Sequence, residues 1–222
     1  MTRAPQLRER PCIAVIGDMI QSRTLSRSER PAAQQTFTQL INDLNRQLRK
    51  QLVAAFVITL GDEFQGLLAD GTVIPELVRR VELYPHRDFR LGFGFGTIDT
   101  VIPKNAINVD GPALHNARAA IDQAKSTNRP GGVFVGFGSQ IDRVANGYAR
   151  ILWHLREKMT ERQRRILYLM STGLRQNEVA EQMKITKQAV SQHVAAVGWP
   201  AYLEAETGWS AVFELLPGRD DK

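Results

Sequence analysis

The stretch MTERQRRILYLMSTGLRQNEVAEQMKITKQAVSQH, residues 159–193, predicts three short helices joined by tight turns. Val179 and Met183 recur at helical spacing after Asn177. Thr186 stands where an N-cap residue would start the next helix. Because so short a turn separates the last two helices, they must cross steeply. The pattern therefore predicts an all-α unit of the helix-turn-helix type.

The last of these helices is expected to present a polar outer face. Val190, four residues after Thr186, would point into the shared core. The residues on the outer side are Lys187, Gln188, Ser191 and Gln192. A helix in the major groove meets base edges with its first turns, where Gln pairs with adenine and Lys with guanine or phosphate. The pattern therefore predicts double-stranded DNA as a partner.

Basic side chains surround this expected reading face. Residues 152–198 carry eight Lys and Arg against four acids, within a chain of 222 residues and net charge +6. Such a balance suits a polyanionic partner. The residues expected to contact phosphates are Arg162, Arg164, Arg165, Arg175 and Lys184, and Asn177 and Thr186 complete the predicted DNA-binding set. The same pattern also fits three packed helices that serve only as a scaffold.

The first part of the chain has a different pattern, with strands and helices in the order βαββαβ. The expected elements are residues 11–18, 28–52, 53–60, 64–69, 72–84 and 89–98, followed by a small-residue helix near 116–120 and a strand at 133–137. This order predicts an α+β, ferredoxin-like sheet in which the first strand lies beside the hairpin. Gly92, Gly94 and Gly96 alternate on a strand, which indicates close packing of another element rather than a dinucleotide-binding loop.

Three acidic residues are expected at one end of this sheet. Asp18 ends the first strand, Asp62 lies in the hairpin turn and Glu63 follows it. Carboxylates within a few ångströms of each other repel unless a cation or a proton lies between them, and Mg²⁺ with a bound triphosphate suits such a pair. Asp18, Asp62 and Glu63 are therefore the predicted Mg²⁺ ligands. The alternative is that Asp18 and Asp62 cap tight turns.

Two basic residues are expected near the same edge. Arg118 and Lys125 lie seven residues apart on one helical face, where they would reach an anion held near Asp18. Together with Asp18 and Asp62, they form the predicted nucleotide-binding set. A solvated basic stripe explains the two cations equally well.

Residues 159–193 also resemble known DNA-binding families. The matching residues are Thr160-Glu161-Arg162, Ile166-Leu167, Gly173-Leu174, Glu178-Val179-Ala180 and Ile185-Thr186. They resemble the helix-turn-helix of LuxR-type regulators and of sigma-factor region four. The resemblance covers about forty residues and implies binding to double-stranded DNA.

The N-terminal part resembles other families. Asp18, Gly61-Asp62, residues 90–96 and Gly111 before a small-residue helix resemble the palm domain of class III nucleotidyl cyclases, and Gly61-Asp62-Glu63-Phe64 is similar to a diguanylate cyclase motif. Residues 16–18, Ser22-Arg23 and residues 59–67 are similar to the SatD family of bacterial proteins, over most of residues 11–150. The cyclase resemblance implies a metal-dependent nucleotide site.

The chain departs from the cyclase pattern on the helix after Gly111. The positions of the cyclase Asn and Arg fall on His115 and Ala119, whereas Asn116 and Arg118 are each one residue away. One residue turns a helical side chain by roughly 100°. Without a cation aimed at the developing charge, nucleotidyl transfer loses electrostatic stabilisation. This departure favours binding over turnover.

The predicted organisation is a tail at residues 1–10, a palm-like domain at 11–138, a linking helix at 139–158 and a helix-turn-helix domain at 159–222. The apolar residues Ile141, Val144, Tyr148, Ile151, Leu152 and Leu155 form one side of the linking helix. The apolar segment 200–216 is expected to pack as a closing helix or to mediate self-association. A single cysteine, Cys12, is expected to be buried and inert.

Two functions remain after these observations. In the first, the protein is a sequence-specific transcriptional regulator whose palm-like domain senses a nucleotide or mediates homodimerisation. In the second, it is a Mg²⁺-dependent nucleotidyl cyclase or transferase in which Asp18 and Asp62 hold the metal. No apolar run is long enough for a membrane span, and residues 1–11 do not form a secretory signal, so a cytoplasmic location is expected.

Overall fold

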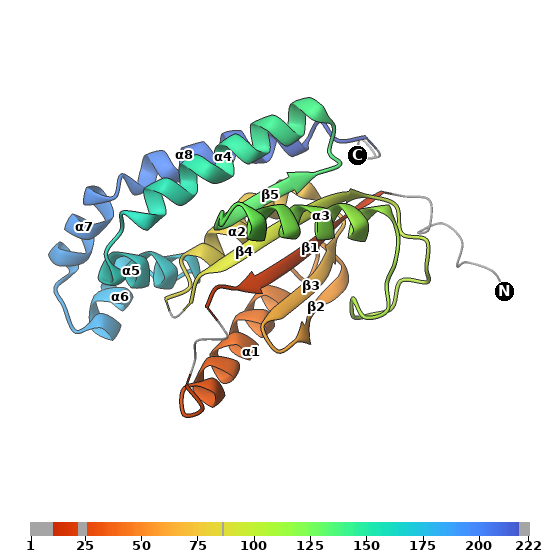
Figure 1. Ribbon diagram of the computed structural model, residues 1–222. Helices are drawn as coiled ribbons and strands as arrows, with labels where there is room; N and C mark the ends of the chain where they lie inside the picture. Colours follow the sequence, from red (N-terminus) through yellow and green to blue (C-terminus); the bar gives the residue numbers. More distant parts are fainter. Residues whose placement is uncertain (1–10, 22–25, 86, 218–222) are drawn as a thin grey trace.

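The computed structural model describes residues 11–21, 26–85 and 87–217. The predicted tail at 1–10 and the Ser22-Arg23 match lie outside the described residues. Within them the protein is α+β, with a five-stranded mixed sheet and eight α-helices (Figure 1).

The sheet has the order β2-β3-β1-β4-β5. Its strands are β1 (Cys12–Met19), β2 (Leu52–Leu60), β3 (Glu63–Leu68), β4 (Phe89–Gly96) and β5 (Gly131–Val135). β4 and β5 are parallel, and the other neighbours are antiparallel. The first strand thus pairs with the hairpin strand β3, as expected from the sequence, and with β4 on its other side.

The helices also occur in the predicted order along the chain. They are α1 (Arg30–Gln47), α2 (Ile74–Glu82), α3 (Pro112–Ser126), α4 (Ser139–Glu157), α5 (Glu161–Ser171), α6 (Gln176–Met183), α7 (Lys187–Ala196) and α8 (Trp199–Phe213). The helix expected at 72–84 begins with a short 3-10 turn, η2 (Gly71–Val73), because the Asp70 side chain accepts a hydrogen bond from the Thr72 backbone N–H at 2.9 Å.

Both faces of the sheet are covered. Ile13 and Val15 of β1 pack on the side of α1 and α2, in a core that includes several phenylalanines. Phe37 of α1 lies 6.0 Å from Phe64 and 5.6 Å from Phe89, measured between ring centroids. The alternate residues, Cys12, Ala14 and Ile16, pack on the side of α3. β1 is therefore buried on both faces, which explains its unbroken apolar sequence.

α3 lies directly on β4 because the strand offers glycine at the contact. A Cβ atom on Gly94 would lie 2.1 Å from the Ala117 backbone nitrogen and 2.3 Å from the Ala113 carbonyl oxygen. A Cβ atom on Gly92 would lie 2.6 Å from the Ala117 carbonyl oxygen. The close packing predicted from the alternating glycines is present, and its partner is the backbone of α3.

α4 buries only part of its apolar stripe. The buried residues are Ala145, Ala149, Leu152 and Arg156, whereas Val144, Ile151 and Leu155 are exposed. Of the predicted face, Leu152 alone is fully buried. The small side chains of Ala145 and Ala149 let α4 approach its neighbours closely, so they occupy the contact instead of the larger residues. Two further residues of the stripe, Ile141 and Tyr148, are partly buried against the core.

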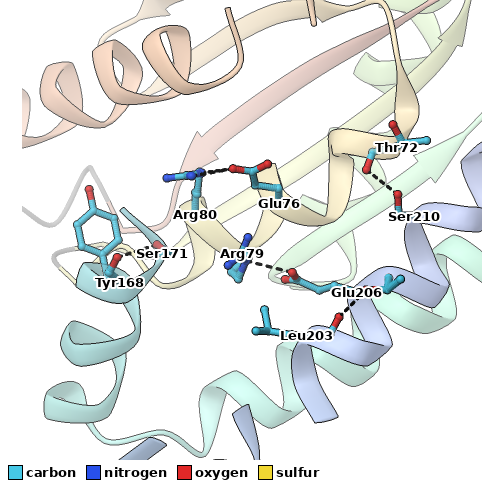
Figure 2. A network of polar contacts seen from close by, with 10 residues as sticks. Thr72, Glu76, Arg79, Arg80, Tyr168, Ser171, Leu203, Glu206 and Ser210 are labelled. Atoms are coloured by element: carbon cyan, nitrogen blue, oxygen red, sulfur yellow. Dashed lines mark hydrogen bonds and ion pairs between the residues drawn. The ribbon is translucent and has the colours of Figure 1, made fainter. Parts of the chain in front are cut away.

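α8 runs beside α4 and packs back on the sheet region (Figure 1). Figure 2 shows two of its polar contacts: the Ser210 hydroxyl donates to the Thr72 carbonyl at 2.8 Å, and Arg79 pairs with Glu206 at 3.1 Å. Trp209 is fully buried, and the centroid of its ring lies 5.7 Å from that of Phe134 in β5. One continuous core extends from the sheet through α4 and α8 to α5, α6 and α7.

No helix in residues 11–21, 26–85 and 87–217 combines the length and the apolar character that a membrane span requires.

Candidate functional site

The three helices α5, α6 and α7 pack on one another at one end of the molecule (Figure 1). α5 begins at a capping box, in which the Thr160 hydroxyl accepts from the Gln163 backbone N–H at 3.2 Å and the Gln163 side chain accepts from the Thr160 N–H at 2.8 Å. α5 ends before Gly173, whose φ of +99° allows the chain to turn. Local sequence thus fixes both ends of the first helix.

The turn between α6 and α7 is three residues long. Lys184 adopts a left-handed conformation at the end of α6, with φ 54° and ψ 46°. Thr186 caps α7, as predicted, because its hydroxyl accepts from the Ala189 backbone N–H at 3.1 Å. The Arg175 backbone N–H donates to the Glu178 carboxylate at 2.6 Å at the start of α6. The left-handed Lys184 and the Thr186 cap thus define the turn that places α7 against α6.

α7 has one buried and one exposed face. Val190 and Val194 are buried against a core that includes Val179 of α6 and Ile166 of α5. The exposed residues of its first turns are Lys187, Gln188, Ser191 and Gln192. The predicted reading residues therefore share one solvent-facing surface, here named the α7 face, and neither α8 nor the sheet covers it.

The flanking residues divide into two groups. The exposed ones are Arg162, Arg165, Arg175, Asn177, Lys184 and Thr186. Arg164 differs, because its guanidinium pairs with the Asp88 carboxylate at 3.1 Å and is only 17 % exposed. Asp88 also accepts from Arg156 of α4. Arg164 thus links α5 to the sheet. Because its guanidinium is held by Asp88, it does not serve the phosphate contact predicted for it.

Two of the three predicted acidic residues face each other across neighbouring strands at the sheet edge. Asp18 lies opposite Glu63 in the β1–β3 register, since Gly61 and Asp62 form the turn that precedes β3. The Asp62 backbone carbonyl accepts a hydrogen bond of 2.9 Å from the Met19 N–H, so Asp62 lies at the same edge of the sheet. Asp18 and Glu63 are both buried, with 9 % and 4 % exposure. The carboxylate that faces Asp18 is therefore that of Glu63.

Cations from α3 and β4 hold these two carboxylates. Arg118 donates two hydrogen bonds of 2.8 Å to Glu63, one to each oxygen. Lys125 lies 3.0 Å from Asp18 and 3.8 Å from Glu63, and Arg90 lies 3.5 Å from Asp18. The paired Glu63 carboxylate is the largest cause that raises the pKa of Arg118. The two cations predicted to bind a nucleotide thus bind the acids directly.

The donor set at this edge fits a metal poorly. In the described ranges, no three His, Cys, Asp or Glu side chains group closely enough to hold a metal ion. Three cations already neutralise Asp18 and Glu63, and Mg²⁺ would have to displace them. The neighbouring helix residues are engaged elsewhere: His115 pairs with Asp110 at 2.8 Å, and the Asn116 amide donates to the Phe95 carbonyl at 2.9 Å.

Burial makes the Cys12 thiol unreactive. Its side chain lies in the core under α3, and burial raises the pKa of the thiol to about 12. Because the thiolate is the nucleophile, a thiol with this pKa is inert at neutral pH.

A buried polar junction between α2, α4 and α8 was not predicted from the sequence. Glu82 is 2 % exposed and its two carboxylate oxygens have no hydrogen-bond partner among the described residues. Burial raises the pKa of Glu82 to about 8, with Arg156 opposing the rise and Glu206 and Asp88 adding to it. Burial also raises the pKa of Glu206 to about 7, against the effect of Arg79. These residues lie on helices far apart in sequence, so no local motif marks them.

The unfolding free energy is expected to fall as pH rises from about 4.5 to about 8. The folded-state pKa of Glu82 lies above its ordinary value of 4.5, so the folded protein binds the proton more tightly than the unfolded chain does in this window. The stabilisation from the proton on Glu82 is complete below pH 4.5 and is lost above about pH 8. Urea unfolding at pH 5, 7 and 8.5 measures the slope. Glu82→Gln should flatten it, and an equal slope in the variant would contradict the assignment.

A family match covers both the sheet and the helical end of the chain. The sequence model of the SatD family matches residues 12–212, from the first residue of β1 into the last turn of α8. The match extends past the predicted range of 11–150 and takes in α5, α6 and α7. A comparison with curated proteins found no significantly similar sequence. Since the family match spans the whole sheet and all but the last residue of the eight helices, the chain belongs to the SatD family.

Proposed function

We propose that this protein is a sequence-specific DNA-binding transcriptional regulator. The observation that supports this most is the α7 face, where four polar, non-acidic side chains are exposed at the start of a helix whose opposite side is buried. A recognition helix needs these properties, because its first turns must enter the major groove while its back is held by the protein.

Exposed cations on α5 and at the ends of α6 suit phosphate contacts. Arg162 and Arg165 lie on α5, and Arg175 and Lys184 lie at the two ends of α6. Phosphate contacts fix register and make affinity dependent on salt, whereas base contacts give specificity. We therefore assign the phosphate contacts to these four residues and the base contacts to Lys187, Gln188, Ser191 and Gln192. A homodimer would suit a palindromic site.

The sheet domain is proposed to regulate this interface. An order that places β1 between β3 and β4 agrees with a ferredoxin-like, palm-like sheet. The pairing of Arg164 with Asp88 and the burial of Trp209 against Phe134 connect the sheet to the helices rigidly. A change at the sheet would therefore reach α5 without a flexible linker.

Lys187→Ala and Gln188→Ala are each expected to weaken specific DNA binding by about 1–3 kcal/mol, because each removes a base-edge contact. Affinity for a selected site, measured by fluorescence anisotropy at fixed salt, checks this. Lys50→Ala removes an exposed cation outside the helical end and is the matched control, with no change expected. Unchanged site preference in both α7 variants would remove the assignment.

The alternative is Mg²⁺-dependent nucleotidyl transfer at the sheet edge. The pair of buried carboxylates, Asp18 and Glu63, is the observation in its favour. The ion pairs of these acids with Lys125 and Arg118 count against it. Incubation of the protein with labelled ATP or GTP and Mg²⁺ or Mn²⁺ separates the two functions. A cyclic or linear product that Asp18→Asn abolishes would establish the enzyme.

A further inference from the structure

Small-molecule sites commonly have volumes of about 300–1,000 Å³. A cleft of about 930 Å³ lies between α4 and the loop that joins α3 to β5. Ile20, after β1, and Asp88, before β4, complete its wall. Neither the α7 face nor the Asp18–Glu63 cluster uses this cleft.

Two arginines in the cleft wall lack a carboxylate partner. No carboxylate in the described parts of the chain lies within ion-pair distance of Arg129 or Arg150. Arg129 donates to the Asn146 carbonyl at 2.6 Å, and its Nε atom is buried with no hydrogen-bond partner among the described residues. Burial and the nearby Arg150 lower the pKa of Arg129. An anion between the two guanidiniums would supply acceptors and relieve their repulsion.

Of the two acids in the cleft wall, Asp88 is held by Arg156 and Arg164, whereas Glu157 shares a 2.8 Å hydrogen bond with the His154 imidazole. Arg129 and Arg150 are therefore two cations against the single Glu157 carboxylate, and this balance of charge at the wall favours an anion.

The cleft also offers an apolar surface. Ile151, which is 63 % exposed although it belongs to an apolar stripe, and Trp153 both line the cleft. The Arg156 guanidinium lies 4.4 Å from the centroid of the Trp153 ring and fixes its orientation. A ligand that fits both surfaces combines an anionic group with a planar apolar group.

We propose that this cleft binds a small organic phosphate, with Arg129 and Arg150 on the phosphate and Trp153 and Ile151 against the planar group. Asp88 connects the cleft to α5, because its carbonyl accepts from the Ile20 N–H at 2.9 Å while its carboxylate holds Arg164. Ligand contact with Ile20 or Asp88 would thus alter the position of α5. This coupling rests on the proposed DNA-binding function, whereas ligand binding does not.

Calorimetric titration of the full chain with AMP and with inorganic phosphate tests the site. AMP is expected to bind, and to bind more tightly than phosphate. Arg150→Ala should weaken AMP binding by about tenfold or more, since it removes a charge-assisted contact. Arg150 is exposed, so the variant keeps the fold; Arg143→Ala, at an exposed arginine of α4 outside the cleft, should bind AMP normally. No binding of AMP at millimolar concentration, or equal affinity in Arg150→Ala, overturns the proposal.

DNA affinity measured with and without saturating AMP tests the coupling. A change in the wild-type protein that is absent in Arg150→Ala supports it. If AMP binds but DNA affinity stays the same, the coupling to α5 is wrong. If no DNA is bound under any condition while AMP still binds, the proposed function fails and the ligand site stands.

Discussion

Gly94→Ala is expected to destabilise the protein by about 3 kcal/mol or more, because its Cβ would collide with backbone atoms of α3. The two collisions, at 2.1 Å with the Ala117 nitrogen and 2.3 Å with the Ala113 oxygen, cannot be relieved by a change of rotamer. α3 as a whole would have to move away from β4. That movement would also separate Arg118 and Lys125 from Glu63 and Asp18.

Urea unfolding followed by circular dichroism measures this effect. Gly147→Ala is the matched control, since a Cβ atom there meets nothing within 4 Å. Gly147 lies inside α4, where Ala is favoured over Gly by about 1 kcal/mol, so this variant should gain stability. A Gly94→Ala protein as stable as the wild type would show that α3 does not lie directly on β4.

Trp209→Ala is expected to cost about 3–5 kcal/mol of unfolding free energy, as large buried aromatic residues do when truncated. Trp209 is fully buried, with its ring stacked on Tyr148 of α4 at 6.1 Å and packed edge-on against Phe134 at 5.7 Å. It therefore joins three elements: α4, α8 and β5. Its loss should also weaken the attachment of the helical end to the sheet.

Thermal and urea unfolding of Trp209→Ala measure the loss. The Trp209 indole N–H has no hydrogen-bond partner among the described residues, so Trp209→Phe should retain much of the stability. Leu203→Ala, at a more exposed position of the same helix, should change stability by no more than about 0.5 kcal/mol. Equal losses for Trp209→Ala and Leu203→Ala would refute the packing role given to Trp209.

Much of the secondary structure could be predicted from local sequence, because periodicity and caps are local signals. Apolar runs marked β1 and β2, and the Gly61-Asp62 turn marked the hairpin between β2 and β3. Thr186 marked the start of α7. The buried face of α4 could not be predicted. Ala145 and Ala149 are buried because they fit the shape of the neighbouring elements, and that shape is not visible in the local sequence. Tertiary packing, which the helical period does not encode, decided that case.

The candidate sites show the same division. The α7 face follows from helical spacing within ten residues and could be predicted. The pairing of Asp18 with Glu63 depends on strand register, which local sequence alone does not fix. Arg129 and Arg150 meet only because the loop before β5 lies against α4. No motif joins two such residues in the sequence.

The central claim is that α7 reads DNA, and selection from a random duplex library with the full chain tests it most directly. The account predicts that the wild-type protein enriches a defined sequence motif and that the double variant Lys187→Ala, Gln188→Ala does not. It also predicts that affinity for the motif falls steeply as salt rises. Enrichment of the same motif by the double variant, or no enrichment by the wild-type protein at about 50 mM salt, would contradict the claim.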